Sequence, residues 1–151
     1  MTPTPLTAAP LTPAPLTAAG MARIHAACFT MPRPWDAAEF ATALADPRSL
    51  VIHQDHGFAL GRIVADEAEL LTLAVAPDAR RQGTGARLMA AFLVGARARG
   101  AESVFLEVAA PNTAARALYE KCGFAQTGLR RGYYRDAKGR AVDAVVLVWG
   151  I

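Results

Sequence analysis

The segment from Glu69 to Arg99 constrains the fold of this 151-residue chain more than any other stretch. Residues 69–75 are nearly all apolar, which is typical of a strand in a central, buried position. A loop rich in arginine and glycine follows. Residues 84–99 then carry an apolar stripe at helical spacing, formed by Met89, Phe92, Leu93 and Ala96. Gly100 comes next, as expected where a helix ends. The unit therefore reads as a strand, a loop and a helix.

The rest of the pattern places further helices and strands around this unit. Asp36 and Glu39 have the spacing of a capping box, which predicts the start of a short second helix. The expected helices cover residues 17–29, 36–45, 84–99 and 113–122, and the expected strands cover 50–53, 58–64, 69–75, 103–108, 124–131 and 141–149. This order mixes antiparallel hairpins with one βαβ crossover. It predicts an α/β fold of the mixed α+β kind rather than a doubly wound parallel sheet.

Residues 1–16 form a separate compositional segment. Thr, Pro and Ala dominate it, and Thr2–Ala9 returns almost unchanged as Thr12–Ala19. Prolines at this density do not fit a helix interior or a buried strand. Two interpretations remain open, namely a partly extended arm or a translation start at Met21. The expected division is an arm at 1–16 and one domain at 17–151.

Charge and composition exclude several classes of function. The net charge is only +3, basic residues cluster only at Arg80-Arg81 and Arg130-Arg131, and aromatic residues make up 7% of the chain. A nucleic-acid surface needs more clustered charge and more stacking aromatics. No apolar run approaches the ~18 residues of a membrane span, and no secretory signal precedes the domain. The sequence predicts a cytoplasmic protein without a membrane or direct nucleic-acid partner.

Cysteine and histidine spacing predicts no metal site. Cys28 and Cys122 are single and far apart, with no C-x-x-C pair. We expect two thiols in a reducing compartment, although spacing alone leaves a disulfide open. The three histidines share no ligand spacing, and His25 is expected to pack on the first helix.

The loop before the third helix has the properties of an anion site. The first amides of a helix lack intrahelical partners, and the helix dipole favours negative charge there. Gly83 and Gly85 allow a ligand to approach the backbone, and Arg80 and Arg81 add positive charge. Two known phosphate loops do not match. The P-loop lysine motif is absent, and Leu88 stands where the dinucleotide fingerprint needs its third glycine.

Several segments in order resemble the GNAT superfamily of acyl-CoA-dependent N-acetyltransferases. They are Leu73-Ala-Val-Ala-Pro-Asp, Arg80-Arg-Gln-Gly-Thr-Gly-Ala, Phe105-Leu-Glu-Val, Asn112-Thr-Ala-Ala-Arg-Ala-Leu-Tyr-Glu-Lys-Cys-Gly-Phe and Arg130-Arg-Gly-Tyr-Tyr. The later strings resemble the RimI branch, which acetylates the N-terminal alanine of a small-subunit ribosomal protein. The resemblance covers residues 19–151. It implies a mostly antiparallel sheet, splayed in a V at the acetyl-CoA site and flanked by about four helices.

The resemblance also implies which residues hold acetyl-CoA. The backbone that pairs with the pantetheine arm would belong to Leu73, Ala74 and Val75. The amides that hold the pyrophosphate would belong to Arg81, Gln82, Gly83, Thr84, Gly85 and Ala86. Asn112 would hydrogen-bond the cofactor from the other side. The implied chemistry needs no metal.

Two residues are expected to carry the chemistry. The resemblance makes Glu107 the general base and Tyr119 the general acid. An amine is largely protonated near pH 7 and must lose a proton before it attacks a thioester, and a carboxylate in an apolar strand can accept that proton. A phenol can protonate the thiolate that leaves. The structural alternatives are a solvent-facing Glu107 and a core aromatic Tyr119.

The acceptor is the least defined part of the prediction. Trp35 either contacts the acceptor or anchors the core. Arg130, Arg131, Tyr133 and Tyr134 are candidates to frame an acceptor peptide. Gly132 replaces the usual Asn of the RimI pattern, and Met31-Pro-Arg-Pro also departs from it.

We expect transfer of acetyl from acetyl-CoA to a protein N-terminus, the alanine of a ribosomal protein, by direct attack. The alternatives are a small-molecule amine or lysine as acceptor, and an acyl-CoA-binding module without turnover.

Overall fold

The computed structural model describes residues 16–29, 31, 33–54, 56–80 and 82–150. The α helices are α1 (Ala18–Cys28), α2 (Ala37–Ala45), α3 (Thr84–Ala98) and α4 (Thr113–Lys121). The strands are β1 (Ser49–Gln54), β2 (Gly57–Val64), β3 (Glu67–Val75), β4 (Ser103–Ala109), β5 (Ala125–Arg135) and β6 (Ala141–Gly150), and a 3₁₀ turn, η2, covers Pro77–Ala79. The predicted order of elements is confirmed. The predicted arm at 1–16 lies almost entirely outside the described residues.

The first two helices begin at side chains that the sequence pattern identified. The Thr17 hydroxyl accepts a hydrogen bond from the Gly20 amide at 3.0 Å and caps α1. Asp36 caps α2 by accepting from the Glu39 amide at 2.8 Å, and the Glu39 carboxylate accepts from the Asp36 amide at 3.0 Å. This reciprocal pair confirms the predicted capping box. It satisfies two amides that have no partner inside the helix.

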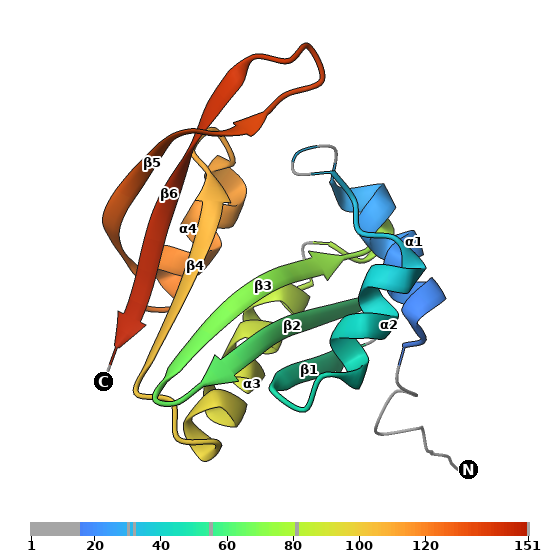
Figure 1. Cartoon of the computed structure of the whole chain (residues 1–151), viewed down its shortest axis with the longest axis vertical. Helices are drawn as coiled ribbons and strands as arrows, with labels where there is room; N and C mark the ends of the chain where they lie inside the picture. The colour runs from blue at the N-terminus through green and yellow to red at the C-terminus, as the bar shows by residue number, and fades with distance from the viewer. Residues whose placement is uncertain (1–15, 30, 32, 55, 81, 151) are drawn as a thin grey trace, which may run out of the picture.

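Six strands form one mixed sheet, in the order β1-β2-β3-β4-β6-β5 within the described residues. The β3–β4 pair is parallel and all other neighbouring pairs are antiparallel. Helix α3 is the crossover between the two parallel strands (Figure 1). The mixed fold with a mostly antiparallel sheet is therefore confirmed.

The sheet splits at its centre. β3 and β4 pair at only three positions, from Glu67 opposite Ser103 to Glu69 opposite Phe105. Beyond this point β3 stays paired with β2 as far as Val75, and β4 stays paired with β6 as far as Ala109. The two strands diverge (Figure 1), and their facing edges lack strand partners. This is the predicted V-shaped splay.

A bulge in β3 changes which side chains face each layer of helices. Thr72 pairs with Leu60 and Leu70 pairs with Gly61, so Leu71 is an extra residue on β3. An extra residue shifts the alternation of a strand by one position. Leu70 accordingly packs in the cluster that includes α3, whereas Ala74 packs in the cluster beneath α1 and α2.

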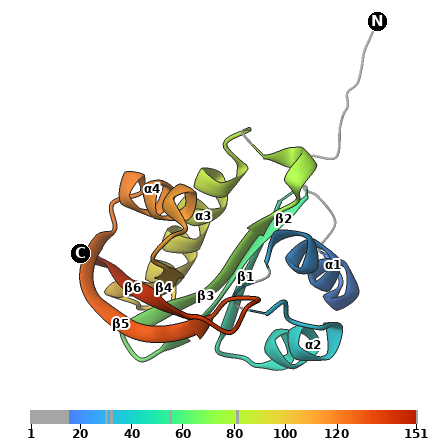
Figure 2. The same cartoon turned by 90° about the horizontal axis from the view of Figure 1, so that it is seen from above.

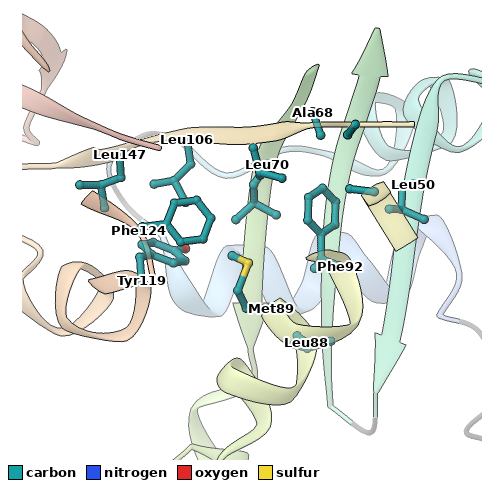
Figure 3. Packing of buried hydrophobic residues seen from close by; sticks show 14 of the residues in the cluster. Leu50, Ala68, Leu70, Leu88, Met89, Phe92, Leu106, Tyr119, Phe124 and Leu147 are labelled. Atoms are coloured by element: carbon teal, nitrogen blue, oxygen red, sulfur yellow. The ribbon is translucent and has the colours of Figure 1, made fainter. Parts of the chain in front are cut away.

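The two helix layers cover opposite faces of the sheet. Helices α1 and α2 lie on one face and α3 and α4 on the other (Figure 2). The larger core cluster lies on the α3 side, where Leu88, Met89 and Phe92 meet Leu70 and Leu106 (Figure 3). The smaller cluster lies on the α1–α2 side, around Met21, Phe40, Phe58, Leu60 and Ala74. Each layer therefore has its own core.

Some details of the sequence prediction were wrong. Strand β5 continues to Arg135 instead of ending near Arg131. Its pairing with β6 shifts register between Arg130 and Tyr134, and Gly132, with a φ of 60°, lies in this irregular stretch. Pairing with β6 then resumes at Tyr134. Leu88 is absent from the predicted α3 stripe, although it is fully buried. Among the described residues, no helix is both long enough and apolar enough to cross a membrane.

Candidate active site

The splay holds a cleft of about 750 Å³. Its lining comes from β3 and β4, from the start of α3, from α4, and from the end of α1. Of the predicted site residues, the described ones that line it are Leu73, Ala74, Val75, Gly83, Thr84, Gly85, Ala86, Glu107, Asn112 and Tyr119. The structure thus brings together residues that lie up to 46 positions apart, since 119 minus 73 is 46. Gln82 is exposed beside the cleft and is not in its lining, and Arg81 lies outside the described residues.

The loop before α3 is shaped by one glycine and one arginine. Gly83 precedes the helix with a φ of 75°, a left-handed conformation that other residues adopt only at a cost. The Arg87 guanidinium donates to the Gln82 carbonyl at 2.8 Å and to the Thr84 hydroxyl at 3.1 Å. These contacts hold the loop against the first turn of α3. Residues 83–86 line the cleft, so the start of α3, where an anion is favoured, borders it.

Asn112 has a structural role in addition to the predicted one. Its side-chain oxygen accepts from the Ala115 amide at 3.2 Å and caps α4. The side-chain nitrogen keeps both of its donor hydrogens, because the cap uses only the oxygen. A helix cap and a donor toward a ligand are compatible at this position.

Glu107 faces the cleft rather than solvent. Its neighbours Leu106 and Val108 point into the α3-side core, so the alternation of β4 turns Glu107 to the opposite face. The side chain is only 13% exposed and forms an ion pair with Arg130 of β5. Its buried Oε2 makes no hydrogen bond of good geometry within the described part of the chain. The Arg130 guanidinium contacts this same Oε2 atom, so a cation already lies beside a carboxylate of the cleft that could accept a proton.

Three tyrosines, two of which line the cleft, have raised pKa values. Burial raises the pKa of Tyr119 well above its ordinary value of 10, with smaller contributions from Cys122 and Tyr134. Burial, and then the charge of Glu107, raises the pKa of Tyr134 to about 12. The charge of Glu107 also raises the pKa of the exposed Tyr133. All three phenols therefore hold their protons at neutral pH, and Tyr119 and Tyr134 line the cleft.

The alternative role that was left open for Tyr119 is also observed. The ring is buried and packs against Phe124, with ring centroids 6.0 Å apart. Tyr119 is therefore a core aromatic that also borders the cleft (Figure 3). The structure leaves both roles available to the same side chain.

A buried polar pair on the α1 side was not predicted as part of the site. His25 lines the cleft, is 1% exposed and lies 2.9 Å from the Thr72 hydroxyl through its Nε2 atom. Its Nδ1 atom accepts from the Trp35 amide at 2.9 Å. The predicted packing of His25 is confirmed, but Thr72 was missed. The only sequence indication was a polar residue inside the apolar run of residues 69–75.

Gly132 occupies a position that explains its departure from the RimI pattern. Its φ is 60°, and its amide donates to the Asp143 carboxylate at 2.8 Å. Asn is among the non-glycine residues that best tolerate a left-handed backbone. Gly and Asn can therefore both adopt the left-handed backbone conformation that this position has.

Other cleft residues have simpler roles. Cys28 and Cys122 are free thiols, and the Cys28 thiol donates to the Val75 carbonyl at 3.2 Å. Trp35 lines the cleft and also packs near Phe40, with ring centroids 5.2 Å apart. No group of three His, Cys, Asp or Glu side chains within the described ranges is arranged to hold a metal ion.

The comparisons with known proteins agree with this geometry. Residues 18–124 match the model of the acetyltransferase (GNAT) family, which is more than half of the chain. The chain belongs to the GNAT acetyltransferase family. A crystal structure of the ribosomal-protein-S18-alanine N-acetyltransferase from Escherichia coli superposes on this GNAT fold with a TM-score of 0.77 and 36% identity, covering 86% of this chain and 84% of the other. An Arabidopsis thaliana NAA60 structure in complex with acetyl-CoA has the same fold, with a TM-score of 0.78, 19% identity and coverage of 91% and 97%.

Sequence relatives of this GNAT chain have matching names. The [Ribosomal protein bS18]-alanine N-acetyltransferase of Escherichia coli K12 is 43% identical over 90 residues. That match spans 60% of this chain and 60% of the relative, which is less than two thirds of its length. The N-alpha-acetyltransferase RimI of Mycobacterium tuberculosis is 37% identical over 123 residues, or 76% of each chain. The predicted resemblance to RimI-type GNAT proteins is confirmed.

Proposed function

We propose that this protein transfers the acetyl group of acetyl-CoA to the N-terminal amine of a protein, and that the acceptor is the alanine at the start of a ribosomal protein. The observation that carries the proposal is one cleft in the splay that is lined by the Glu107 carboxylate, the start of α3 and the buried Tyr119. The name of the Escherichia coli relative supports the ribosomal alanine as acceptor, and the name of the Mycobacterium tuberculosis relative supports an N-terminal α-amine.

The residues of the cleft fit acetyl-CoA, which GNAT acetyltransferases use and which supplies the reactive thioester. The open edge of β3 at Leu73–Val75 offers backbone groups to an extended arm. The amides that begin α3 suit a pyrophosphate, and Arg81 and Gln82 belong to the same loop. Asn112 also lines the cleft, and its cap bond to Ala115 uses only the side-chain oxygen, so its amide nitrogen can donate to the cofactor. We call these elements, namely residues 73–75, 80–87 and 112, the donor side.

Glu107 and Tyr119 divide the proton transfers between them. Glu107 takes a proton from the acceptor ammonium, directly or through water, so that the nitrogen can attack the thioester carbon. The C–N bond forms, the C–S bond breaks, and Tyr119 donates its hydrogen to the sulfur that leaves. The nitrogen gives up its second proton as the amide forms, and this proton restores the Tyr119 phenol. Because burial raises the pKa of Tyr119, this phenol is protonated over the neutral range and begins each turnover as a donor.

We call the part of the cleft where the acceptor would approach Glu107 the acceptor side. It consists of the end of α1 with Trp35, the polar residue Thr72, and the β5–β6 hairpin from Arg130 to Asp143. Tyr134 lines the cleft, and Arg130 already contacts Glu107. An ammonium group is a cation with three donors and can take the place of the guanidinium beside the carboxylate.

A thiol-release assay with acetyl-CoA tests the proposal. An Ala-starting peptide that copies the bS18 N-terminus should release thiol, whereas the same peptide with a blocked amine should not. Release with small amines or lysine alone would move the function to another class of acceptor. Tight binding of acetyl-CoA without release from any amine would contradict catalysis.

A further inference from the structure

His25 is a buried titratable group that the proton transfers at Glu107 and Tyr119 do not use. It contacts three separate segments, since it belongs to α1, accepts from Trp35 before α2, and reaches Thr72 on β3. Aromatic rings enclose it, with the Phe29 ring centroid at 4.4 Å and the Phe40 centroid at 5.4 Å. A polar group in such surroundings is costly unless its hydrogen bonds are made.

The hydrogen bonds fix the tautomer of this imidazole. The Trp35 amide can only donate, so Nδ1 must be the unprotonated nitrogen. The proton of the neutral ring is therefore on Nε2, which donates to the Thr72 hydroxyl oxygen. Burial lowers the pKa of His25 to about 4, although Glu39 opposes the shift, so the ring is neutral at physiological pH.

This arrangement determines what the Thr72 hydroxyl can do. A hydroxyl has one hydrogen to donate and two lone pairs, and His25 occupies one lone pair. Within the described ranges, no protein group accepts the Thr72 hydrogen. Thr72 lines the cleft, and the bulge at Leu71 turns it to the same face of the sheet as Glu107, across the splay. A pre-oriented donor therefore faces the place where the acceptor must lie.

We infer that the Thr72 hydroxyl, positioned by His25, donates a hydrogen bond to the carbonyl oxygen of the acceptor's first peptide bond and so selects protein N-termini over other amines. This inference rests on the proposed function and specifies how its acceptor is recognised. In a protein N-terminus, the carbonyl oxygen is two bonds from the carbon that carries the amine. A lysine side chain or a simple alkylamine has no carbonyl at that distance, and it would leave the hydrogen of the Thr72 hydroxyl without that acceptor.

A double-mutant cycle between protein and substrate tests the inference. The two substrates are an Ala-starting peptide and the same peptide with its first peptide bond replaced by an (E)-alkene, which lacks the carbonyl oxygen. In the unmodified protein, the alkene should lower kcat/KM about tenfold, as expected for one neutral hydrogen bond. Thr72→Val should lower kcat/KM about tenfold for the normal peptide and cause no further loss with the alkene. Thr72→Ser, the matched control, should still discriminate between the two peptides.

The positioning role of His25 has its own readout. His25→Phe should abolish the difference between the two peptides while the KM for acetyl-CoA stays unchanged. A purely structural histidine would instead lower activity on both peptides by the same factor. Thermal unfolding of each variant verifies that the fold is retained, and Thr72→Val keeps the inference testable if His25→Phe does not fold.

Two outcomes would overturn the inference, and they are distinguishable. Equal losses on both peptides in Thr72→Val would contradict the hydrogen bond to the carbonyl alone, with the proposed function intact. Failure of the unmodified protein to acetylate any peptide, with thiol release from other amines, would contradict the proposed function and the inference together.

Discussion

The helix starts on the donor side of the cleft are held by contacts between residues close in sequence, whereas the acceptor side is held by contacts between residues farther apart. Val75 of the donor side is an exception, since the Cys28 thiol donates to its carbonyl. On the donor side, Arg87 contacts Gln82 and Thr84, which are five and three residues away, and Asn112 contacts Ala115 three residues away. On the acceptor side, His25 and Thr72 are 47 residues apart. Gly132 and Asp143 are 11 residues apart.

This difference explains which half of the site a sequence motif can reveal. A helix start with its loop is a local structure, so its requirements appear as a short pattern of Gly and Arg. A pair such as His25 and Thr72 forms only when α1 docks on the bulged part of β3. The acceptor side is accordingly where related chains can differ in specificity while they share one donor.

The largest effect is expected at Glu107, where the two sides meet. Glu107→Gln keeps the shape of the side chain but cannot accept a proton, so kcat/KM should fall roughly 10³-fold. The loss should be greatest at low pH, because an α-amine with a pKa near 8 is increasingly neutral above that pH and needs the base less. Kinetics between about pH 6 and 9 measure this. An equal loss at every pH would contradict the assignment of the base.

Tyr119 should show the next largest effect, confined to the chemical step. Tyr119→Phe removes the proton donor but keeps the buried ring, so kcat should fall roughly 10²-fold with little change in the KM for acetyl-CoA. Tyr134→Phe is the matched control, because Tyr134 also lines the cleft and its pKa is also raised. If Tyr134→Phe lowers kcat and Tyr119→Phe does not, the general acid is Tyr134 on the acceptor side.

The acceptor side should be more sensitive to acid than the donor side, because it depends on His25. His25 has a pKa of about 4 in the fold, below its ordinary value of 6.5, so the unfolded chain binds the proton more readily. Its contribution to the free energy of unfolding is complete above pH 6.5 and is lost as the pH falls toward 4, by up to about 3 kcal/mol. Denaturant unfolding over this range measures the loss. If His25→Phe, a variant without this group, shows the same pH dependence, another group is responsible.

Gly83 and Gly100 flank α3, and their replacement distinguishes an effect on acetyl-CoA binding from an effect on the free energy of unfolding. Gly83 has a φ of 75° beside the cleft, and Gly100 has a φ of 94° with no atom within 4 Å of the position that a Cβ would take. Replacement of either glycine by Ala should lower the free energy of unfolding by about 1–2 kcal/mol. Only Gly83→Ala should also raise the KM for acetyl-CoA, by roughly tenfold, since it moves the amides at the start of α3. An equal KM increase in both variants would contradict the loop's role.

The smallest effect is expected at Gly132 on the acceptor side. Gly132→Asn keeps the amide that binds Asp143, and its Cβ would lie at an ordinary 3.5 Å from the Ala141 Cβ. The free energy of unfolding should change by less than about 1 kcal/mol, because Asn tolerates positive φ. Gly132→Val should cost more. If Gly132→Asn is as destabilising as Gly132→Val, tolerance of a positive φ is not what this position requires.

The sequence was sufficient for the order of the elements, and most of the described residues predicted to bind acetyl-CoA line the cleft. Capping residues, glycine at a helix start and apolar periodicity are local, so Asp36, Gly83 and the α3 stripe could be identified without coordinates. The bulge at Leu71 could not, because a bulge depends on the pairing of β3 with β2. The continuation of β5 past Gly132 and the burial of Leu88 also depend on contacts between distant segments.

The position of an acetyl group on a peptide with two amines tests the proposed function most directly. The substrate is an Ala-starting peptide that also contains one lysine, incubated with acetyl-CoA and analysed by fragmentation mass spectrometry. The account predicts a single acetyl group on the N-terminal amine and none on the lysine, with loss of the product in Glu107→Gln. Acetylation of the lysine in preference to the N-terminus would contradict it.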